Sequence, residues 1–163
     1  MKRIRKSTMN DLPEMLEIFA NARKYMAEHG NPNQWNDNWP SKEILISDIE
    51  IGQSYIVEDD EKGILATYAY ILGVDKTYLE IDGAWLTDKP YGTIHRLASS
   101  HKERDIFSFI IKEITPNGLN MRIDTHANNA SMIRAILKNG FKFCGVISPI
   151  EGGDRNAYEL DIK

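Results

Sequence analysis

The chain has 163 residues and a formal net charge of −4; 42% of its residues are hydrophobic and 27% are charged. This balance is typical of a folded globular protein and excludes a disordered chain. The sequence has no polybasic tract and no apolar run of membrane-spanning length, so we expect neither a nucleic-acid nor a membrane partner. The basic start, Met1 to Arg5, lacks the apolar segment of a signal peptide. The single cysteine, Cys144, excludes an internal disulfide, and we expect a cytoplasmic location.

Apolar residues at helical spacing and stretches rich in β-branched and aromatic residues define the elements of the first half. In chain order we predict a strand at 2–6, a helix from a cap at Asn10 to about 29, a helix after Ser41 to about 49, and strands at 54–58, 64–72, 77–86 and 92–98. The polar segment 31–40, which contains two prolines, is predicted to be a loop.

The second half alternates helices and strands. Ser100 to Glu103 has the S-x-x-E form of a capping box and predicts a helix that ends near Gly118. Strands are then predicted at 119–125, 141–147 and 156–162, with a helix between the first two that is capped by Asn128 or Asn129. The order β-α-α-β-β-β-β-α-β-α-β-β predicts a mixed α/β sheet in a single domain spanning 1–163.

The most specific pattern lies in the C-terminal third. RIDTHANNASM at 122–132 is followed by ILKNGFKFCG at 136–145, so that a Gly-Phe pair comes eleven residues after Asn129. This arrangement closely resembles the second half of the GNAT (GCN5-related N-acetyltransferase) superfamily, and Trp35, Trp85 and HRLA at 95–98 look like landmarks of one bacterial branch. The resemblance covers nearly the whole chain. It implies a splayed central mixed sheet flanked by helices, with acyl-CoA between two parallel strands.

The resemblance also implies where the acyl donor, acetyl-CoA, binds. A helix that begins just after a strand offers unpaired N–H groups to a phosphate. The residues assigned to acetyl-CoA are Leu97, Ala98, Ser99, Lys102, Glu103, Arg104, Asp105, Ile106, Phe107 and Asn129.

Two positions depart from the family pattern. The pyrophosphate loop of the family usually reads R/Q-x-x-G-x-G/A, whereas here Asp105 and Phe107 replace the glycines and Glu103 adds a carboxylate. The Tyr that often protonates the departing thiolate would fall at Ile136. These departures favour an alternative function, that of a catalytically degenerate GNAT-fold protein that binds CoA or a protein partner without turnover. A Phe107 side chain that blocks the phosphate site would support partner binding.

Transfer of an acetyl group to an amine requires a base near neutral pH. His95 is the first candidate, because its ordinary pKa suits proton removal and its strand leads to the expected thioester. Asp82 and His126 are the other candidates, and Glu80 and Asp124 are further possibilities. The alternatives are hydrogen-bonded structural histidines and, for the two acids of the 77–86 strand, a solvated strand face.

Two tryptophans are candidates for the acceptor site. Trp35, in a polar loop, is expected to wall the acceptor pocket, whereas core packing is favoured for Trp85. Cys144 is expected to be a small buried hydrophobe, and no metal site is expected. Together the features predict an acyl-CoA-dependent N-acyltransferase. Its acceptor is expected to be a small-molecule amine or a peptide N-terminus or lysine, and a homodimer is common in such families.

Overall fold

The computed structural model describes residues 1–31, 35, 39–149 and 153–162. The elements are β1 (Lys2–Lys6), η1 (Met9–Asp11), α1 (Leu12–Glu28), α2 (Lys42–Ile51), β2 (Ser54–Asp59), β3 (Gly63–Leu72), η2 (Lys76–Tyr78), β4 (Asp82–Gly83), β5 (Tyr91–Ser99), α3 (Ile106–Ile114), η3 (Thr115–Asn117), β6 (Asn120–Thr125), α4 (Ala130–Lys138), β7 (Lys142–Ile147) and β8 (Arg155–Leu160). The predicted order of helices and strands is confirmed.

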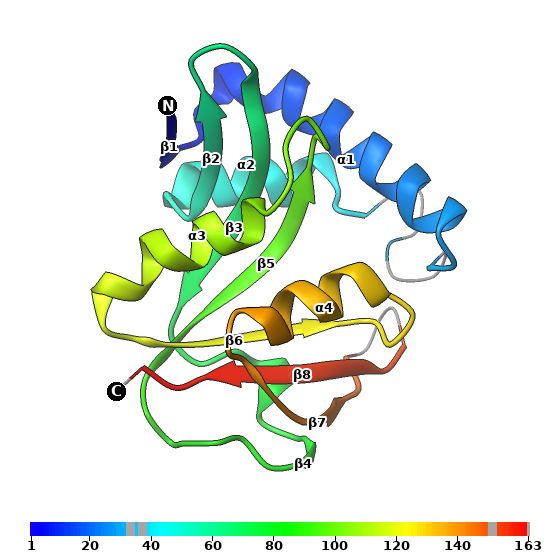
Figure 1. Ribbon diagram of the computed structural model, residues 1–163, viewed down its shortest axis with the longest axis vertical. Coiled ribbons are helices and arrows are strands. Elements are labelled where there is room, and N and C mark those ends of the chain that lie inside the picture. Colours follow the sequence, from blue (N-terminus) through cyan, green and yellow to red (C-terminus); the bar gives the residue numbers. More distant parts are fainter. Residues whose placement is uncertain (32–34, 36–38, 150–152, 163) are drawn as a thin grey trace.

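The strands form one mixed sheet in the order β1-β2-β3-β5-β6-β8-β7-β4. Figure 1 shows α3 and α4 on the near face of this sheet and α1 and α2 behind it. The near face is packed by an apolar cluster that includes Val57, Ile94, Met121 and Ile136. On the far face, α1 and α2 cover the first strands, and the β3–β5 connection covers the later ones. The predicted α/β fold is therefore confirmed.

Strands β5 and β6 are the parallel pair, and they remain together only briefly. The ladder joins Tyr91 to Asn120, Gly92 to Met121 and Thr93 to Arg122. β6 keeps its other partner, β8, as far as Thr125, and β5 keeps β3. The strands then diverge toward the right-hand side of Figure 1. We call this divergent part, 94–99 of β5 and 123–125 of β6, the splay.

The segment 77–86 is not the strand that the sequence predicts. It contains η2 and the two-residue β4, which pairs with β7 at the outer edge of the sheet. Its aromatic residues Tyr78 and Trp85 pack over the sheet as a cluster, so their strand-like composition reflects burial rather than pairing.

The predicted capping box at Ser100 is also wrong, because α3 begins six residues later. The backbone N–H and the hydroxyl of Ser100 both donate to the carbonyl of Leu65, which prolongs the contact of β5 with β3. His101 then has a positive φ of 61°, which a helix cannot contain. At the first helix, a Thr8–Asp11 capping box precedes α1, rather than a cap at Asn10.

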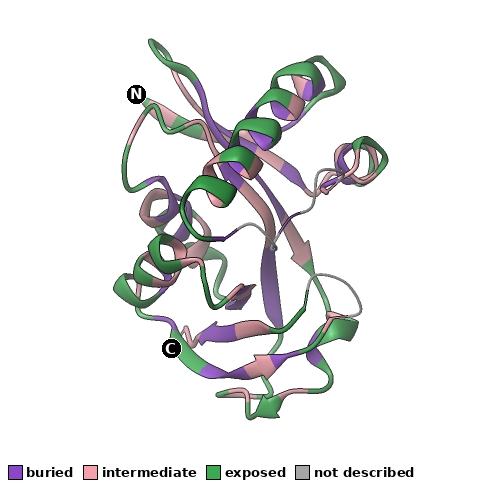
Figure 2. Ribbon diagram, turned by 90° about the vertical axis from the view of Figure 1, so that its right-hand side faces the viewer, coloured by how far each residue is buried: buried purple, intermediate pink, exposed green. Residues whose placement is uncertain are grey.

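Burial follows the layers. In Figure 2 the central strands carry most of the buried residues, and the outward turns of the helices are exposed. Among the described residues, no helix has the length and apolarity needed to cross a membrane.

Candidate active site

The splay leaves two strand edges without ladder partners facing each other. β5 extends six residues and β6 three residues beyond their last pair, Thr93 with Arg122. Backbone N–H and C=O groups on a strand edge hydrogen-bond readily to an extended ligand. The candidate active site is built around these edges.

A β-bulge lies in the β5 arm of the splay. Thr67 of β3 faces Ala98 and Ala69 faces His95, so β5 carries one residue more than β3 over this interval. The extra residue is accommodated at Arg96, whose φ is 52°. Because the bulge interrupts the alternation of side chains, His95 and Arg96 both form contacts on the α1/α2 side of the sheet.

Arg96 is held by a buried carboxylate. Its Nε–H donates to Asp48 Oδ2 at 2.8 Å and its Nη2–H to Oδ1 at 2.9 Å, and Gln53 donates to the same Oδ1. The Asp48 side chain, on α2, is 3% exposed. This two-point contact ties the bulge to α2 and supports a positive φ that a non-glycine residue adopts only at a cost.

His95 is paired with Asp75 from the β3–β5 connection. His95 Nε2 lies 2.7 Å from Asp75 Oδ2, and the two side chains are 23% and 18% exposed. Burial acts to raise the pKa of Asp75, but hydrogen bonds from His95 and Thr77 outweigh it and lower this pKa to about 2. An ionised carboxylate only accepts hydrogen bonds, so Nε2 carries a proton, and in a neutral ring the lone pair is on Nδ1.

The depressed pKa of Asp75 also stabilises the fold. The carboxyl has its ordinary pKa near 3.8 in the unfolded chain and a lower one in the folded chain. Its stabilising contribution is therefore complete above pH 4 and is lost as the pH falls toward 2.

Asp124 of β6 lies on the other arm of the splay. The hydroxyl of Tyr78 donates to Asp124 Oδ2 at 2.6 Å, and Arg155 Nη1 lies 3.6 Å from Oδ1. Burial and the neighbouring Asp124 charge raise the pKa of Tyr78 well above its ordinary value, so the phenol remains protonated. The Tyr78 ring lies 6.1 Å from that of His95, which brings the two arms together over one aromatic side chain.

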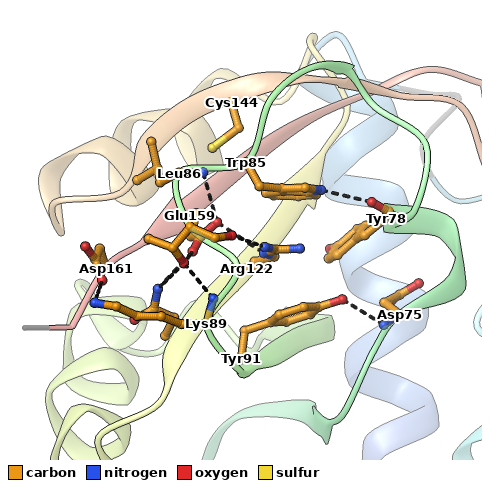
Figure 3. Close-up of polar contacts among 12 residues, drawn as sticks. Asp75, Tyr78, Trp85, Leu86, Lys89, Tyr91, Arg122, Cys144, Glu159 and Asp161 are labelled. Atoms are coloured by element: carbon orange, nitrogen blue, oxygen red, sulfur yellow. Dashed lines mark hydrogen bonds and ion pairs between the residues drawn. The ribbon is translucent and has the colours of Figure 1, made fainter.

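The paired part of the two strands is closed by buried polar groups (Figure 3). The guanidinium of Arg122 lies between the rings of Trp85 and Tyr91, 4.1 and 4.0 Å from their centroids. Arg122 Nε also donates to the fully buried Glu159. Glu159 further accepts hydrogen bonds from Leu86, Thr87 and Asn120. These contacts fasten the β3–β5 connection to β6 and β8.

The two tryptophans considered for the acceptor site, Trp35 and Trp85, both pack in hydrophobic clusters. Trp35 is 8% exposed and packs on Phe19 of α1, so its ring belongs to the core beneath α1 and α2. Trp85 donates through Nε1 to the carbonyl of Tyr78 and covers Arg122. Core packing for Trp85 is thus observed, and the pocket wall expected of Trp35 is not.

Of the remaining candidates, Asp82 lies on β4, separated from β6 by β7 and β8, and is exposed. The structure therefore does not bring it to the splay. His126 follows β6, and its Nδ1 accepts a hydrogen bond from the N–H of Asn128. Cys144 is buried, and burial raises the pKa of its thiol, as expected for a small hydrophobe. Within the described part of the chain, no group of three potential metal ligands converges.

Solved structures with the same arrangement of strands and helices include several acetyltransferases. A GNAT-family acetyltransferase from Streptococcus agalactiae is 28% identical, with 99% of this chain and 95% of that chain covered and a TM-score of 0.87. The chain belongs to the GNAT superfamily. A putative acetyltransferase from Staphylococcus aureus is 23% identical over 98% of this chain and 99% of that one, with a TM-score of 0.72. A putative acetyltransferase from Salmonella typhimurium, solved with its cofactor acetyl-CoA, is 15% identical over 99% and 94%, with a TM-score of 0.63. No family model and no curated protein matches the sequence.

The segment predicted to be the pyrophosphate loop folds without the glycines of the family pattern. Asp105 takes the place of the first glycine and adopts φ 59°, a left-handed conformation that Asp accepts more readily than most residues. Its carboxylate points to α4, where it pairs with Lys138. Phe107, at the second glycine, is buried and packs on Phe141, so its ring lies in the core.

The extra carboxylate of the loop is neutralised. Glu103 accepts hydrogen bonds from Lys2 and, at 3.1 Å, from Lys62, and these bonds lower its pKa. Lys102 is directed to the β2–β3 turn, where its ammonium donates to the Lys62 carbonyl at 2.9 Å. Arg104 remains exposed beside the start of α3.

The first turn of α3 lacks a side-chain cap. Asp105 makes no cap hydrogen bond, and the amide hydrogens of the first helical turn have no intrahelical acceptor. On the other arm, Asn129 caps α4 by accepting from the N–H of Met132, as predicted. Ile136, where the family often has Tyr, is fully buried.

Sequence reasoning missed the partners of the candidate residues. Asp75, Tyr78 and Asp48 come from a loop, a short 3₁₀ turn and a distant helix, and no motif marks them. Arg96 lies inside the HRLA segment, but nothing in the sequence predicted the bulge there.

Proposed function

We propose that this GNAT protein is an acetyl-CoA-dependent N-acetyltransferase that transfers the acetyl group directly to an amine. The proposal rests on the separation of β5 from β6 after Thr93. Acetyl-CoA is the cofactor of the Salmonella typhimurium relative, which has the same fold.

The residues around the splay fit acetyl-CoA. The open edges of β5 and β6 suit an extended amide-containing arm, with Leu97, Ala98 and Ser99 along β5. The uncapped start of α3 and the charge of Arg104 suit a pyrophosphate, and the carboxylates of the loop are paired with lysines. Acetyl-CoA supplies an acyl thioester, whose thiol is the leaving group.

The bulge is suited to polarise a carbonyl. A backbone N–H held in a fixed position stabilises developing negative charge without a cost of reorganisation. Here Leu97 follows Arg96, and the Asp48 contact fixes the backbone at this point. We assign the polarising N–H to this part of β5 and the positioning role to Arg96 and Asp48.

His95 is suited to accept the proton of the amine. Asp75 holds Nε2–H, which orients the ring and leaves Nδ1 as the basic nitrogen. In the transfer the amine nitrogen forms a bond to the acyl carbon, the carbon–sulfur bond breaks, and the amine proton moves to His95. Because Ile136 cannot donate a proton, water protonates the departing thiolate.

Ile136 also supports a second candidate function, which is binding without turnover. A fully buried Ile136 leaves the usual position of the general acid apolar. A protein of this type would bind CoA as a sensor or present its surface to a protein partner.

Measurements of acetyl-CoA binding and of turnover distinguish the two candidate functions. We expect acetyl-CoA to raise the melting temperature, because a ligand specific for the folded state stabilises it. We also expect free thiol to be released when a panel of small amines and peptides is added. A shift without thiol release from any acceptor would favour binding alone, and no shift at saturating acetyl-CoA would exclude both CoA functions.

A matched pair of variants tests the location of the site. Arg104→Glu places a negative charge beside the start of α3, whereas Lys112→Glu makes the same kind of change on an exposed position further along that helix. We expect the first variant, and not the second, to reduce the acetyl-CoA shift. A homodimer is part of this proposal and is tested by light scattering.

A further inference from the structure

A small cavity lies between the end of α1 and the start of α4. It has a volume of about 160 Å³. One wall comes from Tyr25, Met26 and His29, and the other from Asn128, Ser131 and Arg134. This volume accommodates a small polar group with a few carbon atoms, since one water molecule takes up about 30 Å³ of liquid.

The cavity lies across the open end of the splay. Asn128 and Ser131 belong to the turn and helix that follow β6. On the opposite side, the ring of Tyr25 stacks on that of His101, 4.3 Å away, in the loop that follows β5. A ligand that extends outward along the splay therefore reaches this cavity.

The lining has donors and positive charge but no carboxylate. Arg134 is exposed and makes no ion pair with any residue that the structure describes. His29 Nδ1 donates to the Tyr25 carbonyl at 2.8 Å, so Nε2 of the neutral ring is an acceptor and the donors for an anion come from Arg134. A planar guanidinium recognises a carboxylate through two parallel hydrogen bonds.

We propose that this cavity binds a carboxylate group of the acceptor, which makes the substrate an amine that also carries a remote carboxylate. This inference rests on the proposed transferase function. Asn129, which is assigned to acetyl-CoA, also lines the cavity, so the cofactor passes beside it. The acceptor is favoured as the occupant because one wall comes from the end of α1, on the face of the sheet opposite to α3, whose first turn is assigned to the cofactor phosphates.

The spacing of the two groups follows from the splay. β6 extends three residues past its last pair with β5. At about 3.3 Å per residue this is about 10 Å. The carboxylate of the acceptor therefore lies several bonds from its amine, and peptides of increasing length determine the spacing that fits.

Glycine oligomers test this requirement. Glycine, diglycine, triglycine and tetraglycine are compared with their C-terminal amides as acceptors, with thiol release as the readout. We expect triglycine to have a KM about tenfold below that of its amide, and glycine to show no such preference. Equal KM values for acid and amide throughout the series would overturn the inference.

The variant Arg134→Gln tests whether Arg134 is the cation that binds the carboxylate of the acceptor. The control is Lys112→Gln, at another exposed position. We expect R134Q to raise the KM for triglycine about tenfold and to leave kcat, the KM for the amide and the KM for acetyl-CoA unchanged. K112Q should change none of these. If R134Q instead raises the KM for acetyl-CoA, the cavity binds a phosphate of the cofactor and the inference is wrong.

Calorimetry separates this inference from the proposed function. Triglycine and its amide are titrated into the wild-type protein and R134Q in the presence of CoA. Binding of the acid that depends on Arg134, without thiol release in the assay, would support the cavity and contradict the transferase. Thiol release with no preference for the acid in either measurement would contradict the cavity alone.

Discussion

The β5–β6 pair has two parts with opposite polar chemistry. In the paired part, Arg122 and Glu159 are 8% and 0% exposed, and the structure provides each with several partners. In the splay, His95 is 23% exposed and contacts Asp75 through one ring nitrogen, and the facing strand edges are unpaired. One part uses its polar groups to hold three strands together, and the other leaves them for a ligand.

This difference indicates how one pair of strands combines rigidity with binding. A parallel pair that separates must be held firmly where it is joined, or the arms would close or slide. The Arg122–Glu159 network provides that hold together with the aromatic cluster around Tyr78 (Figure 3). The splay can then remain open, because its arms are tied elsewhere, to β3 and α2 on one side and to β8 on the other.

The largest expected effect comes from breaking the paired part. Glu159→Gln removes the charge that compensates the buried Arg122, and we expect a loss of about 3 kcal/mol in the free energy of unfolding. Urea unfolding measures it. The control is Asp161→Asn, which breaks the exposed Lys89–Asp161 pair at 2.8 Å and should cost less than about 1 kcal/mol. Equal losses in the two variants would contradict the structural role of the network.

The next effect belongs to the splay. His95→Ala should lower turnover about a hundredfold, the lower end of the range for loss of a general base. The urea midpoint should fall modestly, because Asp75 loses its hydrogen bond from His95. Asp75→Asn should lower turnover in the same direction, because an amide no longer fixes the tautomer of His95. Unchanged kcat in His95→Ala would remove this residue as the base.

A smaller effect is expected where the bulge meets α2. Asp48→Asn weakens the two-point contact with Arg96 and should lower kcat about tenfold, because a displaced donor stabilises charge less well. The Kd for acetyl-CoA, measured by calorimetry, should remain unchanged. A loss of affinity with unchanged kcat would place Arg96 in cofactor binding rather than in positioning.

Local sequence signals predicted most of the elements but failed where a segment is shaped by its neighbours. The helix α4 was predicted with its cap at Asn129, because the side chain, the apolar spacing and Gly140 act within one helix. The segment 77–86 was mistaken for a strand, because its aromatic residues are buried by packing on Arg122 and β8. Trp35 was assigned to a pocket for the opposite reason, since its neighbours in the sequence are polar although its own ring packs in the core.

The candidate site divides in the same way. His95 and the segment assigned to acetyl-CoA were predicted from the sequence, because they lie within or beside a recognisable pattern. Their partners were not: Asp75 is 20 residues from His95, and Asp48 is 48 residues from Arg96. The cavity between α1 and α4 had no signal in the sequence at all.

The sequence by itself determined the order of strands and helices, the GNAT resemblance and the arm of the sheet that carries His95. These follow from patterns within about ten residues, where backbone geometry sets which side chains share a face. Only the tertiary structure decided which side chains meet across the sheet, that the loop carboxylates are paired with lysines, and that the lost glycine is replaced by a left-handed Asp105. The reason is physical: contacts between distant segments depend on how every layer packs, and no local pattern records that packing.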